Sequence, residues 1–154
     1  MTSLNEAIER RTAGHLRIAA VRVQRNDNLS ATLSRLGLDY QGEPCREVDG
    51  MEARRMLTAL FARDLAYKIA LMPQADAERF ADFVSQEVFP RNAKLLTNVD
   101  EFDEYFCLEE KAYRAEPFVG SYASFFIGTK ATFSAGIIAV GEHVVACVWV
   151  EDED

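Results

Sequence analysis

The residues with the most chemical potential in this sequence are the carboxylates that follow position 98. The segment TNVDEFDEYFCLEEKAYRAEP contains seven carboxylates but only two basic residues, Lys111 and Arg114. If a helix begins near Asn98, several of these acids lie three or four positions apart and repel one another by a few tenths of a kcal/mol per pair. A cationic partner would relieve this repulsion and would associate faster through electrostatic steering. The surface that this pattern predicts consists of Asp100, Glu101, Asp103, Glu104, Tyr105, Glu109 and Glu110.

The same segment has two other interpretations. Its acids can form a solvated helix face whose aromatic residues, including Phe102 and Phe106, pack inward. In the first interpretation Tyr105 is instead an anchor for the partner, since aromatic side chains often dominate binding energy. Paired carboxylates can also bind a divalent cation, but the string DEFDE lacks the glycine and the ligand spacing of a calcium-binding loop. We therefore expect neither a metal nor a cofactor.

Nucleophilic chemistry has little support in this sequence. Cys107 lies among acids that would raise its pKa, and Cys147 lies in an apolar stretch typical of a protein core. Cys45, next to Arg46, is the one thiol with a cationic neighbour. None of the cysteines carries a recognisable catalytic signature, so no catalytic residue is predicted. Whether the protein is an enzyme stays open, and the sequence favours the view that it is not.

Composition and charge limit the class of protein and of partner. The chain has 154 residues, of which 49% are apolar and 27% charged, a composition typical of one globular domain over 1–154. Residues 1–72 carry a net charge of +2 and residues 73–154 a net charge of −10. The second half would repel phosphates, so direct nucleic-acid binding is not expected. The sequence contains neither a signal peptide nor a stretch long enough to span a membrane, and we expect a cytoplasmic protein with reduced cysteines.

The elements that must position the acids are mostly helical in the first 115 residues. A capping box at Ser3 and Glu6 predicts a first helix, and leucines at helical spacing predict another over 29–36 that ends at Gly37. The stretch 15–24 fits either a helix or a strand, and we favour the helix because its alternation breaks at Ala20. The following stretch, 39–50, is predicted to be a loop. A long helix then begins near Met51 and ends before Pro73, and a further helix covers about 75–88 and packs against it as an antiparallel partner.

The character of the chain changes after Pro117. Recurring glycines and β-branched residues predict strands over 121–128, 131–140 and 143–150, with a hairpin turn at 141–143. The last strand is apolar on both faces and should lie between two layers, with Trp149 in the core. The fold class predicted is α+β, with four to five helices over about 1–115 packed on a small antiparallel sheet of two to three strands over about 118–150. The acidic residues 151–154 are expected to form a solvated tail.

These observations favour a small acidic module that binds a basic protein. The partner would be a toxin-like or nucleic-acid-binding protein, and the module an inhibitor or an immunity-type protein that covers it with carboxylates. This comparison is one of size and charge, since no motif supports it. The alternative is an enzyme or a small-ligand-binding protein whose site is assembled from the 39–50 loop and the C-terminal sheet. A homo-oligomer with the aromatic stretch 118–133 as its interface is a third interpretation.

Overall fold

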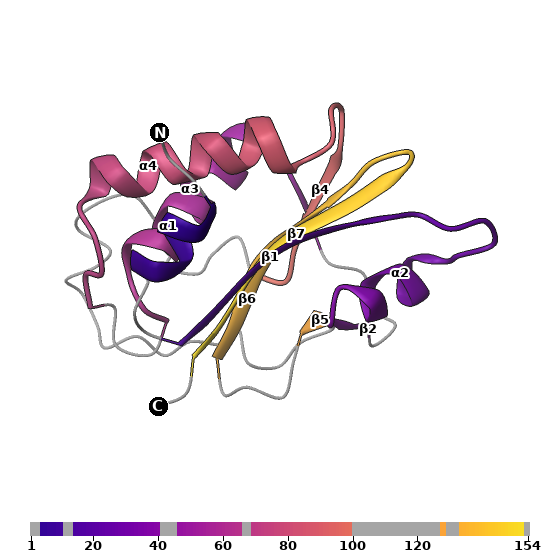
Figure 1. Cartoon of the computed structure of the whole chain (residues 1–154), viewed down its shortest axis with the longest axis horizontal. Coiled ribbons are helices and arrows are strands. Elements are labelled where there is room, and N and C mark those ends of the chain that lie inside the picture. Colours follow the sequence, from indigo (N-terminus) through magenta and orange to yellow (C-terminus); the bar gives the residue numbers. More distant parts are fainter. Residues whose placement is uncertain are drawn as a thin grey trace.

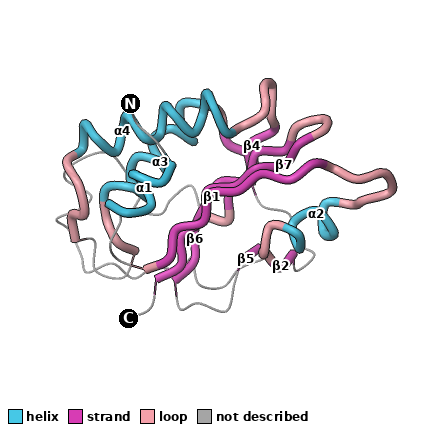
Figure 2. Tube along the Cα trace, viewed as in Figure 1, coloured by secondary structure: helices cyan, strands magenta, loops and turns pink. Residues whose placement is uncertain are grey.

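A five-stranded antiparallel sheet forms the centre of the fold, and helices pack on both of its faces (Figure 1 and Figure 2). The computed structural model describes residues 4–10, 14–40, 46–65, 69–99, 127–128 and 133–152. The strand order in the sheet is β1-β7-β6-β4-β3, and β2 pairs separately with β5. The elements are α1 (Leu4–Arg10), β1 (His15–Arg22), α2 (Leu29–Arg35), β2 (Asp39–Tyr40), β3 (Arg46–Val48), α3 (Gly50–Ala62), α4 (Gln74–Phe83), the π-helical η1 (Val84–Val88), β4 (Lys94–Thr97), β5 (Ile127–Gly128), β6 (Phe133–Val140) and β7 (Val144–Asp152).

Strand β7 is the most buried element because it alternates between two apolar layers. Val148 and Val150 face the cluster that α1, α3 and α4 form, while Cys147 and Trp149 face the cluster built around α2. Trp149 has no exposed surface. The structure therefore confirms a last strand that is apolar on both faces and that places Trp149 in the core. The predicted turn between β6 and β7 is also present, since the Gly141 amide donates to the Val144 carbonyl over 2.9 Å.

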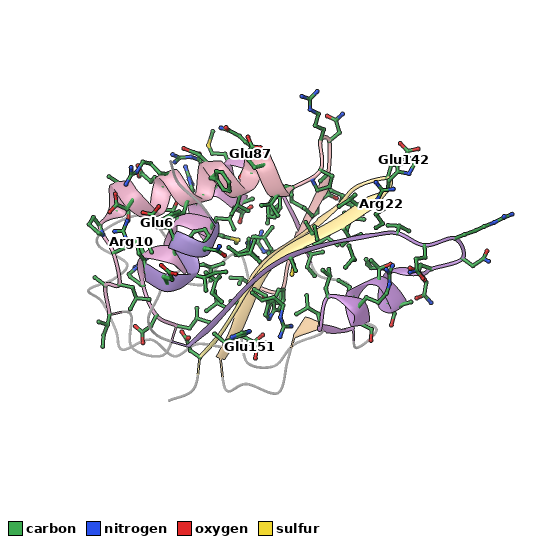
Figure 3. The ribbon with its side chains drawn as sticks, viewed as in Figure 1. Glu6, Arg10, Arg22, Glu87, Glu142 and Glu151 are labelled. Carbon is green, nitrogen blue, oxygen red and sulfur yellow. The ribbon has the colours of Figure 1, made fainter. Side chains whose placement is uncertain are left out.

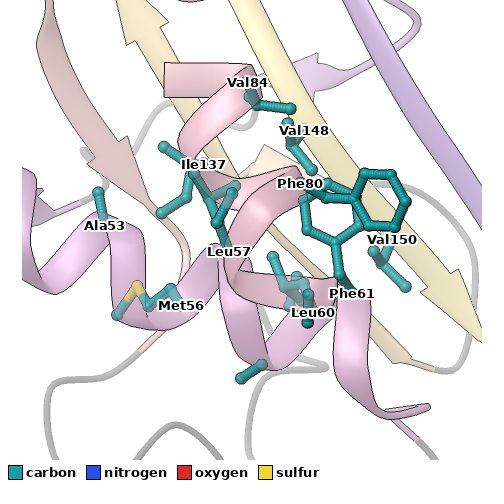
Figure 4. Close-up of a cluster of buried hydrophobic side chains, with 14 of the residues drawn as sticks. Ala53, Met56, Leu57, Leu60, Phe61, Phe80, Val84, Ile137, Val148 and Val150 are labelled. Atoms are coloured by element: carbon teal, nitrogen blue, oxygen red, sulfur yellow. The ribbon is translucent and has the colours of Figure 1, made fainter. Parts of the chain in front are cut away.

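The larger apolar layer lies between the sheet and the pair α3 and α4 (Figure 4). Helix α3 begins where the Asp49 side chain accepts a hydrogen bond from the Glu52 amide, which satisfies one of the unpaired amides of the first turn. Phe61 of α3 and Phe80 of α4 pack with their ring centroids 5.8 Å apart. Among the helices that the structure describes, none is long and apolar enough to cross a membrane.

Helix α2 covers the other face of the sheet, and its limits agree with those that the sequence predicted. The Asn28 side chain accepts from the Ala31 amide and caps the helix at its start. Leu33 and Leu36 pack on the sheet in the cluster that contains Trp149. Gly37 follows the helix with φ +82°, a left-handed conformation that glycine adopts without a steric penalty. Both predicted ends of this helix are confirmed.

The sheet is larger than the sequence predicted and begins earlier in the chain. Two to three strands were expected after residue 118, yet β1, β3 and β4 come before residue 100 and bring the sheet to five strands. The helix favoured for 15–24 is wrong, because these residues form β1 and pair continuously with β7 from His15 and Glu151 to Arg22 and Val144. This partner is more than 120 residues away, so local periodicity does not show it. The expected loop over 39–50 likewise contains β2 and β3.

The long helix predicted from Met51 to Pro73 stops at Ala62. The chain turns back there, and the Leu71 amide donates to the Ala62 carbonyl over 2.7 Å. Asp64 secures the turn with its side chain, which accepts from the Ile69 amide. Pro73 then precedes α4, and the second predicted helix is present as α4 followed by η1.

The acidic ending is not a solvated tail over its whole length. Glu151 and Asp152 belong to β7, and only 3% of the surface of Asp152 is exposed. Its carboxylate accepts from the buried Leu65 amide over 2.5 Å, which ties β7 to the turn after α3. Gly14 makes room for this carboxylate, since a Cβ there would lie 1.5 Å from Oδ1 of Asp152. The predictions for Glu153 and Asp154 lie outside the described residues.

Candidate functional site

A polar cluster lies where β4 leaves the sheet, directly before the acidic segment. We define it as Arg17, Thr97, Asn98, Ser134, Trp149 and Glu151. Thr97 is the last residue of β4, and beyond it side chains take over the hydrogen bonds of the strand. Its hydroxyl donates to the Gly136 carbonyl over 2.8 Å, while the Asn98 side chain accepts from the Gly136 amide over 3.2 Å and donates to the Ser134 carbonyl over 2.8 Å. The edge of β6 therefore stays satisfied after its neighbouring strand has ended.

Trp149 connects the cluster to the core. Its indole N–H donates to the Ser134 hydroxyl over 2.7 Å, so the polar atom of this buried ring has a partner. The ring lies against Gly136, where an added Cβ would lie 2.4 Å from a ring carbon and 2.3 Å from the Val148 carbonyl. Only a residue without a side chain fits beneath the indole ring at this position.

Arg17 and Glu151 lie on the same face of the sheet, because Arg17 pairs with Trp149, two residues before Glu151 on β7. Glu151 lies at the end of the sheet opposite Arg22 and Glu142 (Figure 3). Arg17 donates to the carbonyls of Leu36 and Gly37 over 3.3 and 2.8 Å, which satisfies acceptors at the end of α2. Its other terminal nitrogen lies 3.6 Å from Oε1 of Glu151. That oxygen is buried and accepts no hydrogen bond, so its compensation in the described structure is the charge of Arg17.

Arg46 fixes the chain just before the acidic segment starts. Its Nε donates to the Val99 carbonyl over 2.6 Å, and a terminal nitrogen donates to Oε1 of Glu52 over 2.6 Å. The Val99 amide in turn donates to the Thr97 hydroxyl over 3.1 Å. Val99 itself is 2% exposed. The chain therefore reaches residue 100 from a buried and hydrogen-bonded position.

The cations of the described structure are largely committed to its own carboxylates. Arg54 of α3 forms two hydrogen bonds with Asp82 of α4, of 2.7 and 3.1 Å. Asp76 lies between two arginines, and their hydrogen bonds, Arg10 first and Arg79 second, hold its pKa below the ordinary range. The paired cations are Arg10, Arg17, Arg35, Arg46, Arg54, Arg79 and Lys94.

The polar cluster holds structure together, and no nucleophile is activated in it. Cys147 neighbours it on β7, but burial raises the pKa of this thiol to about 11, and the nearby Arg17 charge offsets only part of that effect. The thiol is therefore protonated at neutral pH and a poor nucleophile. The described ranges contain no group of three or more histidine, cysteine and carboxylate side chains placed to hold a metal ion.

The predicted partner surface falls outside the described residues. Asp100, Glu101, Asp103, Glu104, Tyr105, Glu109 and Glu110 all lie between residues 99 and 127, and so does the helix expected near Asn98 beyond its first residues. Asn98 itself does not begin a helix, because its side chain binds β6. For the alternative site, β2 pairs with β5, while β3 lies in the large sheet with β4 between it and β6. Cys45 lies outside the described residues.

Sequence reasoning missed Thr97, Asn98 and Ser134. Their signal was weak: a pair of polar residues directly after two leucines, and one serine in an otherwise apolar strand. No local sequence pattern shows that Thr97 and Asn98 replace backbone hydrogen bonds to β6, the strand that carries Ser134. We also compared the chain with protein families, curated proteins and solved structures, and no match was found in any of them.

Proposed function

We propose that this chain is a small protein-binding module that neutralises a basic partner protein through the carboxylates of residues 100–110. Asp100, Glu101, Asp103, Glu104, Glu109 and Glu110 supply the charge in this proposal, and Tyr105 supplies an aromatic anchor. The partner is a basic protein of the kind that itself binds nucleic acid or acts as a toxin. The module does not bind nucleic acid directly, because its acidic half repels phosphates.

The observation that supports the proposal is the commitment of the chain's own cations. Seven arginine and lysine side chains of the described structure already pair with carboxylates that lie outside 100–126. Residues 100–126 contain seven carboxylates against Lys111 and Arg114 alone. Seven of the chain's 17 arginine and lysine side chains are thus engaged elsewhere. Because the acids of 100–126 outnumber the basic residues of the same stretch by seven to two, an external cation is the partner that this local imbalance favours.

The anchoring of the segment adds to this argument. One end is held at Val99 by Arg46, and the other returns to the scaffold at Ile127, which pairs with Tyr40 in the two-stranded ladder. A binding segment with both ends fixed loses less conformational entropy on association than a segment with one free end. The charge raises the rate of encounter, and the aromatic residue provides burial after contact.

We infer a cytoplasmic location for this activity. The buried thiol of Cys147 is free, and reduced buried cysteines are typical of a reducing compartment.

The proposal is tested by a charge-reversal variant in which Asp100, Glu101, Asp103 and Glu104 all become lysine. A matched control reverses four exposed or half-buried carboxylates of the helices and the β6–β7 turn, Glu9, Glu78, Glu87 and Glu142, so both proteins gain the same net charge. Each purified protein is used to capture basic proteins at about 0.05 M and about 0.5 M salt, where screening differs strongly.

We expect the wild type and the control to capture the same basic protein at low salt, and the 100–104 variant to lose it. Thermal unfolding of the variant should match that of the control. Equal loss in both proteins would show that only net charge matters, and unfolding of the 100–104 variant would show that these acids are structural. Either result contradicts the proposal.

A further inference from the structure

Among the strands that the structure describes, β1 is an edge of the large sheet. It pairs with β7 on one side through His15–Arg22, and no other described strand lies on its outer side. The register to β7 is continuous and contains no bulge, and no proline interrupts the strand. The opposite edge, β3, is only three residues long. Natural edge strands are usually short, bulged or covered, because their unpaired backbone groups accept further strands.

The hydrogen-bond pattern shows which backbone groups of β1 point outward. The Val23 amide donates to the His143 carbonyl over 2.8 Å, so this pair, which continues the register of β1 and β7, is hydrogen-bonded. Hydrogen-bonded pairs alternate with non-bonded pairs along antiparallel strands. The amide and carbonyl groups of Leu16, Ile18 and Ala20 therefore point away from β7.

An independent contact agrees with this assignment. Arg35 donates to the Arg22 carbonyl over 2.7 Å from outside the sheet, so this carbonyl also points away from β7. Arg35 thus closes one end of the edge. For Leu16, Ile18 and Ala20, the part of the chain that the structure describes offers no backbone or side-chain partner on the outer side. Ala20 is exposed and Ile18 is partly exposed, so the edge is accessible there.

The charge of the edge determines what kind of strand fits. From Gly14 to Arg25 the chain has four basic or titratable side chains, His15, Arg17, Arg22 and Arg25, and no carboxylate. Arg17 is committed to Glu151 and to the end of α2. Arg22 and Arg25 are exposed and form no ion pair with the described residues. Two of the described acids belong to this end of the sheet: Glu142 in the β6–β7 turn, 3.7 Å from His143, and Asp27, which pairs with Arg35.

We propose that the open edge of β1 binds an extended, acidic peptide segment of another protein as a sixth strand of the sheet. The outward groups of Ile18 and Ala20 supply the main-chain hydrogen bonds, and Arg22 and Arg25 select carboxylates on the incoming strand. This surface consists of other residues than 100–110 and takes a partner of the opposite charge, so it stands whether or not the proposed function holds.

The probe for this proposal is a blocked peptide of about eight residues, the length of a typical strand, in which valine and threonine alternate with glutamate. A second peptide carries lysine in place of each glutamate. Both are titrated into the full chain, and binding is followed residue by residue through the amide signals and their hydrogen exchange. We expect the glutamate peptide to slow exchange at Ile18 and Ala20, and the lysine peptide to have no effect.

Two variants separate the main-chain and charge contributions. Ala20→Pro removes an outward donor without touching the ladder to β7, and should weaken binding about fivefold, the effect of one lost hydrogen bond. Its control is Ala20→Thr, which keeps the amide. Arg22→Glu combined with Arg25→Glu should weaken binding at least about tenfold. Its control, Arg55→Glu combined with Arg91→Glu, makes the same charge change at exposed arginines of other elements.

Several results would overturn the proposal. Equal binding of the two peptides would remove the charge argument, and binding without protection of Ile18 and Ala20 would place the peptide elsewhere. Absence of binding by either peptide would show that Arg22 and Arg25 guard the edge against pairing. Protection of the same amides that grows with protein concentration in the absence of peptide would identify a second copy of the chain as the occupant. If Ala20→Pro does not fold, the charge variants still decide.

Discussion

Replacing Asn98 with alanine is the most direct test of how the sheet ends at the acidic segment. The substitution removes the acceptor of the Gly136 amide and the donor to the Ser134 carbonyl, which are 3.2 and 2.8 Å from the Asn98 side chain. Each partly buried hydrogen bond contributes about 1 kcal/mol, so we expect a loss of about 2 kcal/mol in the free energy of unfolding. For a chain of this size that lowers Tm by about 4 to 8 °C.

A second variant, Asn98→Asp, tests whether the side chain at this position must donate a hydrogen bond to the Ser134 carbonyl. Aspartate keeps the acceptor for the Gly136 amide but loses the donor and places a negative charge against the Ser134 carbonyl oxygen. At neutral pH it should cost at least as much as alanine, and acidification should recover part of the loss because a protonated carboxyl can donate again. Urea unfolding at several pH values measures both effects. If Asn98→Ala costs less than about 0.5 kcal/mol, or Asn98→Asp is as stable as the wild type, the side chain does not replace the ladder.

Three further predictions concern the core, the thiol and the surface ion pairs. Gly136→Ala should destabilise the protein by about 3 kcal/mol in thermal unfolding, because neither the Val148 carbonyl nor the buried indole can move aside. The control Gly50→Ala places its methyl group in open space and should be neutral or slightly stabilising. Equal effects of the two substitutions would contradict the packing argument. For the thiol, Cys45 and Cys107 are replaced with serine, and the folded protein is treated with iodoacetamide at pH 8. The reagent should modify Cys147 only as the protein unfolds, because burial raises the pKa of this thiol to about 11. Rapid labelling of the folded protein would show instead that the thiol is accessible. The Arg54 hydrogen bonds lower the pKa of Asp82, so the pair stabilises the fold above the ordinary pKa of 3.8, and this contribution is lost as pH falls through the lowered pKa. Asp82→Asn should therefore cost less than about 1 kcal/mol in urea unfolding at pH 7 and progressively less below pH 3.8. A cost that persists in strong acid would exclude the ion pair as its cause.

Local patterns predicted the elements whose signals are local. Helix α2 has a capping asparagine at one end and a glycine in the left-handed region at the other, and both are visible in sequence. Strands β6 and β7 are neighbours joined by a short turn, so their pairing follows from the sequence alone. The helix prediction for residues 15–24 was wrong because Ala19 and Ala20 fit a helix or a strand equally well, and the pairing with β7 selects the strand.

The remaining errors have the same origin. The end of α3 could not be predicted from residues 51–72 alone, because the turn there depends on the carboxylate of Asp152 from β7 as well as on Asp64. The same contact explains why a residue expected in a solvated tail is buried. For the polar cluster, the roles of Thr97 and Asn98 depend on the position of β6 beside them, which no local pattern contains. The acids of 100–110 stay a prediction from charge.

The position of β7 between β1 and β6 has a consequence during synthesis. The β1 strand emerges from the ribosome about 120 residues before the strand that will become its neighbour. At about 5 to 20 residues per second, this delay is roughly 6 to 24 seconds, during which β1 has neither of its edges paired. Closure of the sheet therefore waits for a contact between distant parts of the chain, which makes folding slow compared with that of a helical protein of equal length. During this interval a newly made chain is most prone to associate wrongly with other chains. A factor that shields nascent strands would act on it at this stage.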